Sequence, residues 1–180
     1  MANNPEKALP ELHLTKNCWT TVTEGAMYAS TDGQLATQRT VVEVMADEQA
    51  LHVRFTCLDN PYHAANTYTE HNSDMWNQEV FELFIATGDD VPKQYMELEI
   101  NPNNALFSAW VDNPDGMSFD LTFVGHEESG IKHEVSAEGD VWKGTMSVPF
   151  ALIGKSDTYR LNFYRIALKA LPEGNEWVGD

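Results

Sequence analysis

Short runs of alternating apolar and polar residues constrain the fold of this chain more than any other feature. In QYMELEI, residues 94–100, an apolar row of Met96, Leu98 and Ile100 alternates with Tyr95, Glu97 and Glu99. A period of two places successive side chains on opposite faces of a β-strand, whereas a helix repeats every 3.6 residues. We therefore expect a strand whose second face carries a tyrosine and two carboxylates, and whose end continues to Asn101.

Similar runs recur along the chain between turns rich in Gly, Pro, Asn and Asp. Residues 39–46 and 51–58 flank a short polar link and predict a hairpin, while PFALIG, residues 149–154, predicts one turn of helix. Many short strands with regular turns are typical of a sandwich or barrel. The sequence therefore predicts an all-β protein, a two-sheet antiparallel β-sandwich of jelly-roll type, with residues 1–180 as a single domain.

The charge of the chain restricts its partners. It has 11 Lys and Arg against 28 Asp and Glu, a formal net charge of -17, which repels polyphosphates and anionic lipid. No window approaches the roughly 20 apolar residues of a spanning helix. We expect no nucleic-acid partner and no membrane partner. The start shows no basic and apolar leader, which favours a cytoplasmic location; a removed leader would make it extracellular or periplasmic.

Cysteines, histidines and acidic turns give weak signals for metals and cofactors. Cys57 occupies an apolar strand position, which favours a buried thiol, although one disulfide to Cys18 remains an alternative. His63 and His71, with Asp74, match no zinc spacing, so the metal ligands stay unknown. Turns rich in Asp and Asn could hold structural calcium, and we expect no required cofactor.

Acidic and aromatic residues together indicate a sugar site. Glu97 and Glu99 point the same way with about 6.5–7 Å between their Cα atoms, and Glu82 joins them if its strand is the neighbour. Trp76 ends a long polar loop, residues 59–76. Aromatic faces cover the C–H side of a sugar while carboxylates accept its hydroxyl protons.

Two other interpretations of these acids remain open. They could be the solvated face of a half-buried sheet, with Arg54 or Arg165 as the partner of Glu82. They could also catalyse glycoside hydrolysis, which needs two carboxyl groups flanking the scissile bond. Neighbouring acids on one flat face approach from the same side, which disfavours catalysis.

Four motifs in order, MWNQEVFELFI, YMELEINPNN, MSVPFALIG and LNFYRI, resemble the carbohydrate-binding module family 9-like group, a branch of the DOMON-like β-sandwiches. The resemblance implies a non-catalytic domain that binds a terminal or short sugar in polysaccharide catabolism, often beside a glycoside hydrolase and with structural calcium. It assigns Trp76 and Glu82 to the sugar and places Trp177 near the second aromatic. Glu97 and Glu99 stand on the strand where family members place an arginine.

The predicted function is therefore sugar binding without catalysis. The predicted sugar-binding residues are Trp76, Glu82, Tyr95, Glu97, Glu99 and Trp177, and the partner is a small sugar or the end of a polysaccharide. Alternatives are a hydrolase-associated or weakly hydrolytic domain, and a DOMON-like haem or cofactor domain with His71 and Met75 as ligand candidates.

Overall fold

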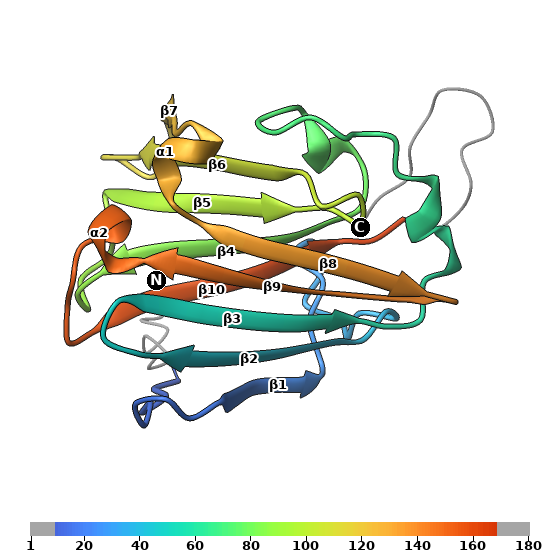
Figure 1. Cartoon of the computed structure of the whole chain (residues 1–180), viewed down its shortest axis with the longest axis horizontal. Helices are drawn as coiled ribbons and strands as arrows, with labels where there is room; N and C mark the ends of the chain where they lie inside the picture. The colour runs from blue at the N-terminus through green and yellow to red at the C-terminus, as the bar shows by residue number, and fades with distance from the viewer. Residues whose placement is uncertain (1–9, 169–180) are drawn as a thin grey trace, which may run out of the picture.

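The computed structural model describes residues 10–168 and contains two antiparallel five-stranded sheets (Figure 1). The first sheet has the order β1 (Thr20–Gly25), β2 (Thr40–Ala46), β3 (Ala50–Cys57), β9 (Val141–Pro149) and β8 (Lys132–Glu138). The second has the order β10 (Tyr159–Ile166), β4 (Val80–Thr87), β5 (Gln94–Ile100), β6 (Leu106–Asp112) and β7 (Asp120–Phe123). The predicted antiparallel β-sandwich is confirmed.

Helix is scarce, as the sequence predicted. Residues 10–168 contain four single-turn segments: η1 (Pro61–Ala65), η2 (Met75–Asn77), α1 (His126–Ser129) and α2 (Phe150–Ile153). The predicted turn in PFALIG is α2, and the predicted hairpin is the β2–β3 pair. Within residues 10–168, no helix is long and apolar enough to cross a bilayer.

The core lies between the sheets and takes one face from each. Phe55 on β3 stacks on Phe81 on β4, with 4.0 Å between ring centroids. Gly144 on β9 makes this contact possible, because a Cβ atom there would lie 2.6 Å from Cζ of Phe55. Cys57 is buried in this core, as expected, whereas Cys18 is exposed. Both are free thiols, so the disulfide alternative is wrong.

A buried ion pair links the two sheets next to this core. Arg165 on β10 donates from Nη2 to Oε1 of Glu79 at 2.8 Å, and both side chains are buried. The indole nitrogen of Trp142 on β9 donates to the same oxygen at 2.6 Å. Arg165 also donates from Nη1 to the carbonyl oxygens of Arg39 and Leu58. The charges are thus satisfied by partners from both sheets.

Candidate functional site

The loop at 59–76 covers one end of the outer face of the second sheet. Met75 is fully buried there in a small cluster with Val80, Phe107 and Ala109. This cluster seats Trp76, whose ring meets Phe107 edge-on with 5.5 Å between centroids. The loop therefore delivers an indole to the sheet face, as its polar sequence and terminal tryptophan predicted.

A row of four side chains crosses the same outer face. Residues directly opposite each other in the strand pairs are Tyr164 and Glu82, Glu82 and Glu99, and Glu99 and Phe107. Cβ atoms of such pairs lie about 4.5–5.5 Å apart and point to one face. The expectation that the Glu82 strand neighbours the Glu97 and Glu99 strand is confirmed.

The next row along the strands carries the third acid and more rings. It runs through Asn162, Phe84, Glu97, Ala109 and Phe123 on five consecutive strands. Tyr95 packs against Phe84 with 5.7 Å between ring centroids. We call this surface the acid–aromatic face; it consists of Glu82, Glu97 and Glu99 with Trp76, Phe84, Tyr95, Phe107, Phe123 and Tyr164.

The three acids differ from ordinary surface carboxylates in their burial. Glu82 is 8% exposed and Glu99 is 2% exposed, and Glu97 is half-buried. Burial, with the charge of Glu97, raises the pKa of Glu82 to about 7. Burial, with the charges of Glu82 and Glu97, raises the pKa of Glu99 to about 9. The interpretation of these acids as a solvated face is therefore wrong.

The arginines considered as partners for Glu82 are engaged elsewhere. Arg54 makes a two-point ion pair with Glu43, with nitrogen–oxygen distances of 2.6 and 2.7 Å. Arg165 pairs with Glu79. Among the described residues, Oε2 of Glu99 is buried and has no hydrogen-bond partner. Burying a polar atom without a hydrogen-bond partner costs free energy. A ligand that forms a hydrogen bond with Oε2 of Glu99 would therefore be stabilised on this face.

At neutral pH the acid–aromatic face offers both donors and acceptors. Glu99 is protonated below its raised pKa and can donate an O–H, whereas an ionised carboxylate only accepts. Hydroxyl groups of a neutral sugar can do both, and the exposed rings of Phe123 and Tyr164 offer apolar surface beside them. The arrangement therefore suits a neutral polyhydroxylated ligand.

One predicted residue, Asn101, does not join this face. Asn101 is fully buried beyond the end of β5, where its side-chain nitrogen donates to the carbonyl oxygen of Tyr68 at 2.9 Å. It anchors the 59–76 loop and is covered by it, so the expectation of an accessible amide on the polar face is wrong. Trp177 lies outside the described residues.

Sequence reasoning missed Phe107, Phe123 and Tyr164 as parts of the face. Alternation in their own strands showed which phase each occupies, but not which strands are neighbours. Met75, a haem-ligand candidate, is fully buried in the small cluster.

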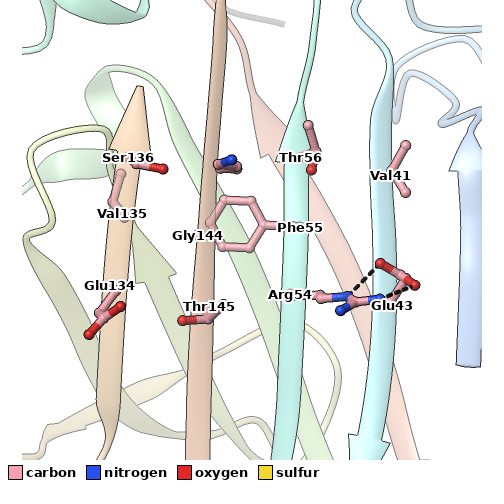
Figure 2. Close-up of a pocket in the computed structure, with 11 residues that line it drawn as sticks. Val41, Glu43, Arg54, Phe55, Thr56, Glu134, Val135, Ser136, Gly144 and Thr145 are labelled. Carbon is pink, nitrogen blue, oxygen red and sulfur yellow. Dashed lines mark hydrogen bonds and ion pairs between the residues drawn. The ribbon is translucent and has the colours of Figure 1, made fainter. Parts of the chain in front are cut away.

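A hollow of about 280 Å³ lies on the outer face of the other sheet, across β2, β3, β9 and β8 (Figure 2). Gly144 forms part of it, and the paired Arg54 and Glu43 form one side. Among the described residues that line it, none has a buried side-chain nitrogen or oxygen without a partner. The hollow thus has no buried, unpartnered polar atom comparable to Oε2 of Glu99.

Replacing Glu99 by Gln should stabilise the protein at alkaline pH. The folded state holds the Glu99 proton up to a pKa of about 9, whereas an unfolded glutamate loses it above its ordinary value of 4.5. The folded state thus binds more protons between these values, so stability falls as pH rises through this window. The Tm of E99Q should match wild type near pH 5 and exceed it at pH 8–9. E134Q, at an exposed strand position, is the control, and a Tm difference that stays constant from pH 5 to 9 would contradict this assignment.

Comparison with protein-family models finds no match for this chain. Among curated proteins, an extracellular protein of Arthroderma benhamiae is 30% identical over 139 residues, covering 71% of this chain and 63% of that protein. The chain therefore spans less than two thirds of the length of this relative.

Solved structures with similar folds are carbohydrate-binding proteins. A Bacteroides uniformis protein to which carbohydrate binding is attributed aligns over 83% of this chain and 71% of its own, with a TM-score of 0.58 and 14% identity. A family 9 carbohydrate-binding module of Caldicellulosiruptor kristjanssonii in complex with cellotriose aligns over 89% of this chain and 69% of its own, with a TM-score of 0.51 and 14% identity. A family 9 module from that organism in complex with glucose aligns over 80% and 65%, with a TM-score of 0.50 and 14% identity. The chain thus shares the β-sandwich fold of carbohydrate-binding proteins that include family 9 modules.

Proposed function

We propose that this chain is a non-catalytic carbohydrate-binding domain that holds a short sugar, or the end of a polysaccharide, on the acid–aromatic face. The observation that carries the proposal is the buried Glu82 and Glu99 pair, directly opposite each other and bordered by aromatic rings. A purely structural pair of acids would have cationic or hydrogen-bond donor partners. A sugar hydroxyl supplies what these carboxyl groups lack.

The fold supports the same proposal by analogy. Family 9 modules with this fold were solved with glucose and cellotriose. Fold alone does not carry function, so the proposal depends on the residues of the face. Strand β5 carries no arginine, which distinguishes the proposed site from the arrangement that the family resemblance implies.

A binding role fits the three acids better than hydrolysis. Hydrolysis needs one carboxyl group on each side of the glycosidic bond. Glu82, Glu97 and Glu99 all project from the same face of neighbouring strands β4 and β5. A ligand resting on this face would meet all three from one side.

We place this activity outside the cell, in the breakdown of polysaccharides. The extracellular naming of the Arthroderma benhamiae relative supports this location. Structural calcium in the Asp- and Asn-rich turns and the wider DOMON-like relationship remain predictions.

Titration calorimetry with glucose, cellobiose, cellotriose and xylo-oligosaccharides tests the proposed function. We expect saturable binding of at least one sugar at millimolar concentration by wild type, and at least tenfold weaker binding by E99Q, which loses the carboxyl group but keeps a similar volume. No heat with any of these sugars would overturn the proposal. A parallel assay for released reducing sugar tests for hydrolysis. If wild type releases sugar and E82Q does not, the chain is an enzyme.

A further inference from the structure

Three histidines from different structural elements meet at one edge of the sandwich. His71 comes from the 59–76 loop, His126 begins α1, and His133 lies on β8. One ring nitrogen from each lies within 4.8 Å of the others. The three side chains thus join the first sheet, the helical turn that follows the second sheet, and the loop that carries Trp76.

The rings pack closely around a common point. His71 and His126 stack with 3.8 Å between centroids, and His133 meets His126 edge-on at 5.1 Å. Neutral imidazole is the commonest metal ligand among side chains. In a tetrahedral zinc site with Zn–N bonds of about 2.0–2.1 Å, the ligand nitrogens would lie about 3.3 Å apart. Because the stacked rings hold their lone pairs in nearly parallel planes, the His71 ring has to turn out of the stack before it and His126 can bind one ion.

Hydrogen bonds determine which nitrogens are available. Nδ1 of His133 lies 2.8 Å from Oδ1 of Asn104, so this nitrogen carries the proton and Nε2 keeps the lone pair. Metal-binding histidines generally donate the N–H of the ring nitrogen that does not bind the metal to an oxygen acceptor, and this hydrogen bond fixes the orientation of the ring. Nδ1 of His126 is buried and has no hydrogen-bond partner among the described residues. If the three rings had only a packing role, this nitrogen would be expected to have a partner.

His71 is the weakest of the three ligands. Its Nδ1 accepts the backbone N–H of Leu106 at 3.0 Å, which leaves the proton of the neutral ring on Nε2. Binding a metal through either nitrogen requires this hydrogen bond to break or the ring to turn. The loss of His71 should therefore cost less affinity than the loss of His126 or His133.

We propose that His71, His126 and His133 form a binding site for a divalent transition-metal ion, Zn²⁺ or Cu²⁺. Three imidazole nitrogens suit these borderline ions better than Ca²⁺ or Mg²⁺, which prefer oxygen. The bound ion would tie the 59–76 loop to both sheets and so stabilise the position of Trp76. The site uses no residue of the acid–aromatic face, so metal binding can be tested whether or not the chain binds a sugar.

Calorimetry on the full chain, free of any histidine tag and treated with chelator, tests the site with ZnCl₂ and CuCl₂. We expect one ion per chain, an affinity at least tenfold lower in H126A and in H133A, and a smaller loss in H71A. H13A removes an exposed histidine and should bind like wild type. N104G keeps the positive φ of 62° at that position accessible while removing the acceptor, and should also weaken binding.

Histidine NMR signals provide a readout on wild-type protein that does not depend on the folding of variants. On addition of Zn²⁺, the ring signals of His71, His126 and His133 should shift together at one equivalent, while those of His13 and His52 stay in place. The proposal is overturned if these signals do not move, or if the triple alanine variant binds Zn²⁺ and Cu²⁺ as wild type does.

Discussion

The variant R165M should lose about 3–5 kcal/mol of its free energy of unfolding, because removing one partner leaves a buried charge uncompensated. Arg165 and Glu79 are both buried, and Glu79 would keep only neutral donors such as Trp142 and Asn60. The carbonyl oxygens of Arg39 and Leu58 would also lose a donor. Urea unfolding followed by tryptophan fluorescence measures the loss.

A second arginine in this chain provides the matched control. Arg54 donates to both carboxylate oxygens of Glu43 at 2.6 and 2.7 Å, but on the outer face of the first sheet, where both side chains reach solvent. Exposed ion pairs contribute about 0–1 kcal/mol, so R54M should change stability little. If R165M unfolds at the same urea concentration as R54M, the buried pair does not hold the sheets together as we describe.

W76A should weaken sugar binding by about 1–3 kcal/mol, roughly 5- to 150-fold, by analogy with the stacking of bases on aromatic side chains. Trp76 is 37% exposed and rests edge-on against Phe107, so its indole is presented to solvent on a buried support. The fold should survive, because the support stays in place when the indole is removed. Calorimetry with the best sugar, together with circular dichroism, separates the two effects.

Trp19 makes a control of almost equal exposure, at 36%. It lies against the guanidinium of Arg54, with 4.3 Å from Cζ to the ring centroid, near the hollow of the first sheet rather than the acid–aromatic face. W19A should bind sugar like wild type. The opposite result, in which W19A loses binding and W76A keeps it, would move the sugar site to the hollow shown in Figure 2.

Local alternation was sufficient to predict strand β5 and its two faces. Met96, Leu98 and Ile100 turn to the core, and Tyr95, Glu97 and Glu99 turn outward, because a strand reverses its side chains at every residue. The same rule located Cys57 in the core. It did not show that Asn101, just beyond the end of the strand at Ile100, is covered by the 59–76 loop.

Burial of the acids could not be predicted from the sequence. Alternation shows that Glu82 and Glu99 face outward, and outward normally means solvated. Their burial and their raised pKa values depend on which strands are neighbours and on which side chains of those strands cover the two carboxyl groups. The same applies to the aromatic rings of β6, β7 and β10 that complete the face.

The sequence by itself determined the class of fold and, in strands such as β5, which residues face inward and which face outward. These follow from the geometry of the extended chain, which is local. Tertiary structure alone decided that Arg165 serves Glu79, that Glu82 and Glu99 lie buried side by side, and that three histidines from a loop, a helical turn and an edge strand converge. Such contacts join separate elements of the chain, and no local periodicity encodes which strands become neighbours.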